Sequence, residues 1–175
     1  INQVKCWMDN LEVDSVIYQP AVNKSWHPLY GERSTVREAY NEATMYLSKK
    51  DGSNYRLNIE VRAYDEGIAF RYFFPEHPQA IFHKVVGDLT EYTFSPGAMA
   101  WAEQWAQAPF EHLAINDIKQ PVERALTVEL SNGLWVALTD ADVDDWCLTK
   151  LVASPTKQNT LTSVMYSPVD IVTYY

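Results

Sequence analysis

The 175-residue sequence contains no run of about 18 apolar residues, which is the length that a membrane-spanning helix needs. It also has no cluster of Lys or Arg, since 14 basic residues are scattered among 23 acidic ones and the formal net charge is −9. Proteins that bind phosphate backbones or anionic lipid usually carry a basic patch. We therefore expect no membrane insertion and no nucleic-acid partner.

Local catalytic and metal-binding motifs are missing as well. The four histidines are isolated, and no pair has the HxxxH, HxH or HExxH spacing of a zinc site. No GxSxG, P-loop or GxGxxG pattern occurs. The two cysteines, Cys6 and Cys147, fit either one long disulfide loop or two buried thiols. The sequence therefore contains no self-contained catalytic motif.

The composition is that of a single globular domain. With 47% hydrophobic residues the chain can bury a sizeable core, and no linker, internal repeat or low-complexity run interrupts it. We therefore predict one domain over residues 1–175. The first residue is Ile1 instead of Met, from which we expect that a leader, a tag or an upstream segment has been removed.

Alternation of apolar and polar residues with a period of two dominates the chain and predicts β-strands. Apolar residues alternate from Met45 to Leu47 and again over residues 55–63, with the turn KKDGSN between them. A second turn at residues 65–67 leads into residues 68–74, which predicts a three-stranded meander. Residues 126–130 and 134–138 flank the turn Ser-Asn-Gly and predict another hairpin, and residues 161–166 predict a further strand.

One Ala-rich segment, residues 98–113, interrupts this pattern. Trp101 and Trp105 lie four residues apart, a spacing that predicts a short helix with both rings on the face that packs against a core. The alternative is a platform on which sugar rings stack. Aromatic residues make up 13% of the chain, and most large rings in β-rich domains fill the core.

The strand predicted at residues 134–138 runs directly into an acidic segment. Asp140, Asp142, Asp144 and Asp145 place four carboxylates within six residues. Like charges this close repel each other, so the segment is either a solvated acidic loop or a site for a hard cation such as calcium. It does not match an EF-hand, because the sixth and twelfth positions counted from Asp140 are Asp145 and Leu151 instead of Gly and Glu. A calcium ion at Asp140 would need most of its oxygen ligands from elsewhere.

A second polar segment, residues 26–43, combines charges of both signs. Its pattern is typical of an exposed, ion-paired connection, and the alternative is an interface with a neighbouring domain. The candidate substrate or interface residues are Glu32, Arg33, Arg37, Glu38, Asn41 and Glu42.

Several segments in this order resemble the amino-terminal domain of glycoside hydrolase family 97, which comprises bacterial α-glucosidases and α-galactosidases. They are WHPLYGER (residues 26–33), REAYNE (37–42), RAYDEGIAFRYFFPE (62–76), TEYTF (90–94) and LTDAD (138–142). The third segment is the most specific, because its strand, acidic-Gly turn and aromatic return strand follow the family pattern almost throughout. The resemblance begins inside the amino-terminal half of the family domain, so we expect the first strands of that domain to be missing from this chain.

The resemblance implies an all-β fold, an antiparallel β-super-sandwich of the galactose-mutarotase type that has one short helix at most. It also implies packing on a downstream (β/α)₈ barrel, which this chain lacks and which carries the catalytic carboxylates. Calcium is the implied cofactor. The family takes one calcium ligand from a Glu-Ala motif after a strand, and Asp140 matches that Glu with a side chain one methylene shorter.

The implied protein is a calcium-dependent α-glycoside hydrolase, either α-glucosidase or α-galactosidase, that acts on α-linked glycans in the periplasm or outside the cell. The chain alone would then be inactive. Two other interpretations are a stand-alone carbohydrate-binding module that uses exposed Trp101, Trp105 or Trp146, and a β-sandwich with only a packing role.

Overall fold

The computed structural model describes residues 7, 9–76, 85–141, 143–144 and 146–165. The chain divides into two compact units, unit 1 (Ile1–His83) and unit 2 (Lys84–Tyr175). The described regular structure consists of strands and one three-residue 3₁₀ turn, η1 (Ile115–Asp117), and the strand pairs are antiparallel. This confirms the predicted all-β antiparallel β-sandwich fold. The assignment of residues 1–175 to a single domain stays a prediction.

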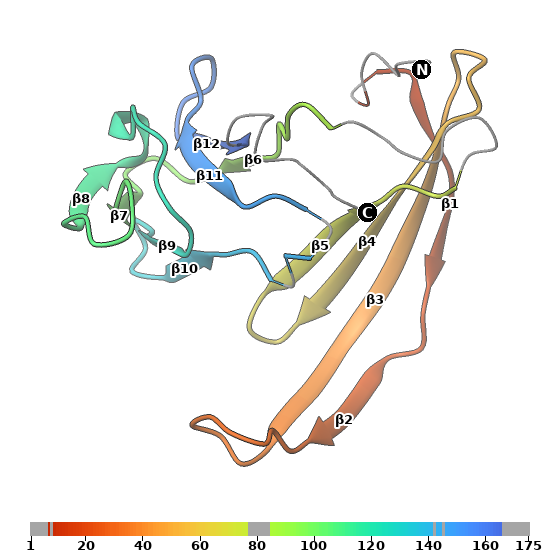
Figure 1. Ribbon diagram of the computed structural model, residues 1–175, viewed down its shortest axis with the longest axis horizontal. Helices are drawn as coiled ribbons and strands as arrows, with labels where there is room; N and C mark the ends of the chain where they lie inside the picture. Colours follow the sequence, from red (N-terminus) through yellow and green to blue (C-terminus); the bar gives the residue numbers. More distant parts are fainter. Residues whose placement is uncertain (1–6, 8, 77–84, 142, 145, 166–175) are drawn as a thin grey trace. The chain divides into compact units, whose positions relative to one another are not determined.

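Unit 1 is a five-stranded sheet with β3 (Val36–Lys49) as its longest strand (Figure 1). The order is β1 (Leu11–Tyr18), β3, β4 (Arg56–Tyr64) and β5 (Ile68–Phe73), and β2 (Val22–Trp26) also pairs with β3. The predicted meander is confirmed, because Leu47 faces Leu57 and Val61 faces Phe70 across its strands. The hairpin turns lie at the two polar, Gly-containing segments that predicted them, KKDGSN and residues 65–67.

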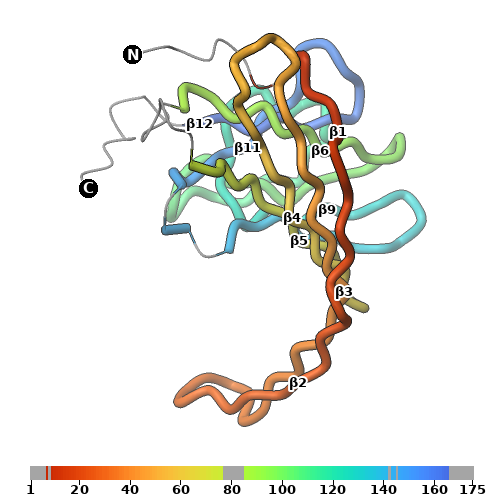
Figure 2. Tube along the Cα trace, turned by 90° about the vertical axis from the view of Figure 1, so that its right-hand side faces the viewer, coloured from red at the N-terminus to blue at the C-terminus, as the bar shows by residue number. Residues whose placement is uncertain are grey.

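The amino-terminal part of β3 pairs with β2 from Val36 to Tyr40, whereas β4 pairs with β3 only from Tyr40 onward. Residues 22–40 therefore form a two-stranded ribbon that extends past the ends of β4 and β5 (Figure 2). The ribbon accounts for much of the polar segment at residues 26–43, since Gly31 and its neighbours form the connecting loop. Sequence alone did not predict this strand pair, because its polar residues do not alternate clearly with apolar ones.

Unit 2 contains two sheets that share one core. The four-stranded sheet has the order β10 (Trp135–Leu138), β9 (Leu126–Glu129), β7 (Met99–Ala102) and β8 (Glu111–Ala114). The three-stranded sheet has the order β11 (Thr149–Ala153), β12 (Thr160–Met165) and β6 (Glu91–Thr93). Buried residues of both sheets, including Val128 of β9 and Leu161 of β12, belong to the same core cluster. The predicted β9–β10 hairpin and the predicted strand near residue 161 are confirmed.

The short helix predicted within residues 98–113 is wrong, because this segment contains β7 and β8 instead. Ala98, Ala100 and Ala102 are buried at alternate positions, and Trp101 points to the other face of the strand. The Ala-rich composition reflects close packing under a sheet instead of helix propensity. The four-residue spacing of Trp101 and Trp105 does not reflect a helix, since Trp101 lies in β7 and Trp105 lies beyond the end of that strand.

Some sequence-based expectations lie outside the described residues, namely those for Asp142, Asp145, Tyr166 and the pairing of Cys6 with Cys147. Within the described ranges, no helix has the length and apolar character needed to span a bilayer.

Candidate functional site around Arg124 and Asp140

The strand register of the β9–β10 hairpin explains why Asp140 meets Arg124. Leu126 of β9 pairs with Leu138 of β10, so the residues two positions further out, Arg124 and Asp140, face each other where the hairpin opens. Arg124 and Asp140 are 16 positions apart in the sequence, and the turn between β9 and β10 brings their side chains together.

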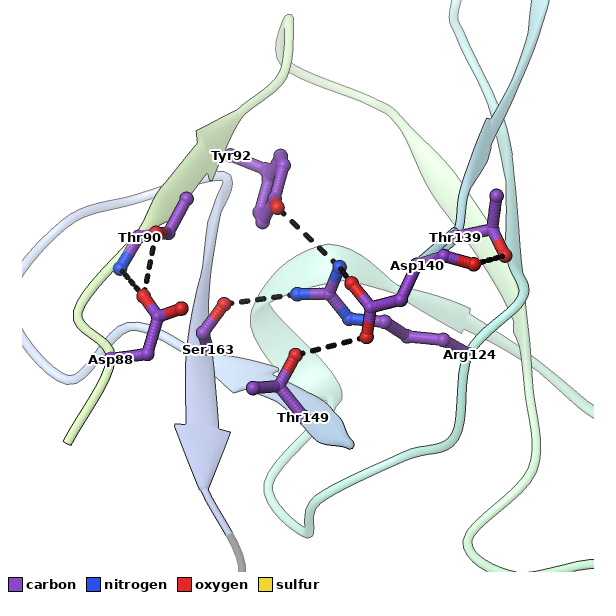
Figure 3. Close-up of polar contacts among 8 residues, drawn as sticks. All are labelled: Asp88, Thr90, Tyr92, Arg124, Thr139, Asp140, Thr149 and Ser163. Carbon is purple, nitrogen blue, oxygen red and sulfur yellow. Dashed lines mark hydrogen bonds and ion pairs between the residues drawn. The ribbon is translucent and has the colours of Figure 1, made fainter. Parts of the chain in front are cut away.

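Asp140 forms an ion pair with Arg124 in which Nη1 donates to the carboxylate Oδ1 at 2.8 Å (Figure 3). The hydroxyl of Thr149 on β11 donates to the second carboxylate oxygen at 3.3 Å. The other guanidinium nitrogen, Nη2, donates to the hydroxyl of Ser163 on β12 at 2.9 Å. Tyr92 on β6 places its ring 5.4 Å from the guanidinium carbon. Arg124 therefore ties the β9–β10 hairpin to the three-stranded sheet.

The guanidinium is almost entirely buried, and the carboxylate is its charge partner. The side chain of Arg124 is 4% exposed, whereas that of Asp140 is 26% exposed. A buried charge is costly unless it is paired and hydrogen-bonded. The Nε atom of Arg124 is buried without a partner in the described part of the chain, so Asp140 and Ser163 carry most of the compensation. Asp88, also drawn in Figure 3, accepts hydrogen bonds from Thr90 instead.

This arrangement does not fit a calcium ion held by the described residues of this chain. Calcium takes six to eight oxygen ligands, and several of them are normally anionic. The described residues contain no group of three or more His, Cys, Asp or Glu side chains placed to hold a metal. Each oxygen of Asp140 already accepts a hydrogen bond, and the negative charge is balanced by Arg124. Asp144, the other described member of the acidic segment with Asp140, is exposed.

The six candidate residues of the polar segment lie in unit 1, whereas Asp140 lies in unit 2. Glu32 and Arg33 are in the exposed loop of the ribbon, and the other four are on β3. Because successive strand residues face opposite sides, Arg37 and Asn41 lie on one face of β3 and Glu38 and Glu42 on the other. The segment therefore presents two different polar surfaces.

Three of these residues make contacts across the strands of unit 1. Arg37 donates from Nε to the side-chain oxygen of Asn23 on β2 at 3.2 Å, and Glu38 forms an ion pair with Lys24 at 3.1 Å. Glu42 accepts a hydrogen bond from Nε of Arg62 on β4 at 2.6 Å. This carboxylate raises the pKa of Arg62, so the guanidinium stays charged. Such partly exposed pairs fix strand register more than they add stability.

The three tryptophans proposed for sugar stacking differ in their surroundings. Trp101 is 41% exposed, and its ring stacks on that of His112 on the neighbouring strand, with the centroids 4.4 Å apart. Trp105 is 58% exposed in the loop that follows β7. Trp146 is half-buried. Trp105 is therefore the most accessible of the three rings.

Sequence reasoning missed Arg124, the residue around which the site is organised. Its partners Tyr92, Asp140 and Ser163 come from three separate parts of unit 2, and Thr149, which donates to Asp140, comes from a fourth. Only the pair with Asp140 could have been found, by extending the predicted hairpin two residues beyond Leu126 and Leu138. The other contacts depend on how the two sheets pack.

Comparison with solved structures shows the same fold in larger enzymes. A glycoside hydrolase family 97 enzyme from Pseudoalteromonas sp. strain K8 in complex with panose matches with a TM-score of 0.82 at 21% identity, over 89% of this chain and 24% of that enzyme. The same enzyme in complex with acarbose gives the same values. A β-arabinopyranosidase matches with a TM-score of 0.70 at 17% identity, over 89% of this chain and 27% of its own. The chain thus spans about a quarter of the length of these enzymes.

The family model described as "Glycosyl-hydrolase 97 N-terminal" matches residues 2–169, which is nearly the whole chain. It confirms the resemblance drawn from the strand, turn and acidic segments of the sequence. The chain belongs to the family of amino-terminal domains of glycoside hydrolase family 97.

Proposed function

We propose that this chain is the accessory β-sandwich domain of an α-glycoside hydrolase, an α-glucosidase or α-galactosidase, whose catalytic barrel lies outside the 175 residues. The observation that carries the proposal is the family match over residues 2–169, together with solved enzymes of which this fold forms about a quarter. The domain would pack on the barrel, border its sugar site and act on no substrate by itself. Its partners would be the barrel and an α-linked glycan.

The ribbon in unit 1 supports a docking role. At its loop, Leu29 is 101% exposed and Tyr30 is 90% exposed, next to the half-exposed Trp26. Large apolar side chains that gather on an exposed protrusion usually mark a surface that another protein segment covers. The candidate interface residues Glu32 and Arg33 lie in the same loop. We therefore assign this loop to the interface with the barrel.

Calcium dependence of the parent enzyme stays part of the proposal, but Asp140 alone could not hold the ion. Any calcium ion would need its other ligands from the barrel, and Asp140 would have to exchange its contact with Arg124 for the ion. Calorimetric titration of calcium into the 175-residue chain should therefore detect no tight site. Micromolar affinity would show that the chain holds the ion by itself, contrary to this assignment.

The decisive experiment is to express the longer reading frame that contains this chain. The product should hydrolyse p-nitrophenyl α-glucoside or α-galactoside, while the 175-residue chain should be inactive. A β-arabinopyranoside belongs in the assay, because a β-arabinopyranosidase is among the similar structures. A reading frame without a barrel, or a product inactive on all three, would refute the hydrolase assignment. Chelation of calcium and fractionation of the source cells test calcium dependence and the proposed periplasmic or secreted location.

A stand-alone carbohydrate-binding module is the second candidate. The exposure of Trp105 favours it, since an accessible indole can stack on a sugar ring. A reading frame that ends without a barrel, combined with sugar binding by the chain, would favour this alternative over the hydrolase domain.

A further inference from the structure

A hollow of about 330 Å³ opens on the surface of unit 2 beside Trp105. Its sides are the loop after β7, with Gln104 and Trp105, and the segment before Val122, with Gln120 and Pro121. Residues of β11 and β12 complete the lining. Ligand pockets in proteins measure roughly 300–1,000 Å³, so this hollow suits a ligand the size of one or two sugar rings.

The walls of the hollow are held by hydrogen bonds within unit 2. Lys150 of β11 has a side chain that is only 4% exposed, and its ammonium forms an ion pair with Glu123 at 2.6 Å. The same ammonium donates to the main-chain carbonyl of Gln104 at 2.6 Å. Val122 bridges to Leu151 through two backbone hydrogen bonds of 2.8 and 3.0 Å. The loop that carries Trp105 and the segment that carries Gln120 are thus fixed to the same strand.

The groups left available in the hollow suit a neutral, hydroxyl-rich ligand. The indole of Trp105 offers an apolar face, on which the C–H groups of a sugar ring can stack. The side-chain amides of Gln104 and Gln120 form no hydrogen bond with other described residues, and each can both donate to and accept from a hydroxyl group. The charge of Lys150 is already balanced by Glu123, so the hollow has no cation to offer an anionic ligand.

We propose that the Trp105 hollow, formed by Trp105, Gln104, Gln120 and Lys150, is a binding site for a neutral mono- or disaccharide unit of a glycan. Every residue that lines the site belongs to unit 2 of this chain. The choice of a glycan as ligand rests on the proposed function, whereas the chemistry of the hollow is independent of it.

The test is titration of maltose and of melibiose into the 175-residue chain, followed by tryptophan fluorescence and by calorimetry. The wild-type chain should show saturable binding of at least one sugar in the millimolar range, as expected for a shallow site with one aromatic ring. The variant Trp105→Ala should weaken binding about tenfold or more. Gln120→Ala, an exposed substitution, should weaken it about threefold. Trp101→Ala is the matched control, because Trp101 is also exposed on unit 2 but stacks on His112 outside the hollow.

Unchanged affinity in Trp105→Ala, or equal losses in Trp105→Ala and Trp101→Ala, would overturn the assignment of the site. Absence of saturable binding to the folded wild-type chain up to the solubility of both sugars would overturn it as well. Circular dichroism of each variant separates loss of binding from loss of fold. Activity of the longer reading frame is a separate measurement, so an active enzyme whose chain binds no sugar refutes this site and leaves the proposed function standing.

Discussion

At the scale of single residues, Arg124 shows how a buried cation can fix the end of a hairpin. Its guanidinium contacts side chains from the segment after β10 and from β12, and it lies near the ring of Tyr92 on β6. Replacing either member of a buried pair leaves the other charge without compensation, which costs more than the pair contributes. The pair is therefore a point at which a single substitution should affect the packing of unit 2.

We predict that Asp140→Asn lowers the free energy of unfolding by about 2–3 kcal/mol, because Arg124 stays buried without a counter-charge. Urea unfolding with and without calcium measures the effect, which should be the same in both conditions. Asp144→Asn is the control, since Asp144 is exposed and has no ion pair with another described residue. A calcium-dependent loss of stability in Asp140→Asn would instead indicate that the chain binds the ion through Asp140.

Asp14 on β1 should make the stability of unit 1 depend on pH in the acid range. Hydrogen bonds from Lys50 and Ser48 lower the pKa of the Asp14 carboxyl below its ordinary value of 3.8. A carboxyl whose pKa is lower in the folded state contributes stability above its unfolded pKa and loses it as the pH falls through the folded value. The stability difference between wild type and Asp14→Asn should thus be constant above about pH 5 and shrink below pH 3.8.

Chemical denaturation over a series of pH values measures this difference. Glu12→Gln serves as the control, because Glu12 is exposed on the same strand and no described residue forms an ion pair with it. A difference for Asp14→Asn that grows as the pH falls would contradict the predicted direction.

At the scale of elements, two turns of the unit 1 sheet each contain one glycine, and the two glycines differ in backbone conformation. Gly52, in the turn between β3 and β4, has a φ of +83°, which side chains rarely adopt. Gly67, between β4 and β5, has no such strain, and both positions have open space around an added Cβ. We predict that Gly52→Ala costs about 1 kcal/mol, whereas Gly67→Ala is neutral or stabilises by up to about 1 kcal/mol. Thermal unfolding of both variants checks this, and equal effects would contradict it.

The strands that the sequence predicted are those marked by a pattern within a short stretch of the chain. The meander of β3, β4 and β5 and the β9–β10 hairpin each combine alternating apolar residues with a short polar turn. The β2–β3 ribbon lacks a buried face, since β2 is exposed over most of its length, so no alternation marks it. In β7 the buried residues are alanines, which resemble a helical composition although their period is two.

At the scale of the whole molecule, the site was less predictable than the fold. Asp140 was found because an acidic segment follows a strand, but its partner was expected to be calcium and the described partner is Arg124. The contacts of Arg124 with Ser163 and Tyr92 span 39 and 32 positions and leave no pattern in the sequence. The Trp105 hollow likewise combines four separate segments, although Trp105 itself was a candidate.

The exposed residues of the ribbon loop test the proposed interface with a barrel. Leu29→Ser and Tyr30→Ser should leave the unfolding of the 175-residue chain unchanged, because both side chains are fully or almost fully exposed. If the loop docks on a barrel as proposed, the same changes in the longer protein should lower the melting temperature by several degrees, since apolar contacts at that interface would be lost. Differential scanning calorimetry of both proteins makes the comparison. No effect in the longer protein would place the interface elsewhere.

The two ends of the β9–β10 hairpin also affect how readily its outer strand could pair with another molecule. β10 is the terminal strand of its sheet, and such strands can recruit a strand from another molecule. Here the four-residue strand is closed by the Ser-Asn-Gly turn at one end and anchored by the salt bridge to Arg124 at the other. A short strand fastened at both ends has little freedom to shift its register, so it offers a poor template for aggregation.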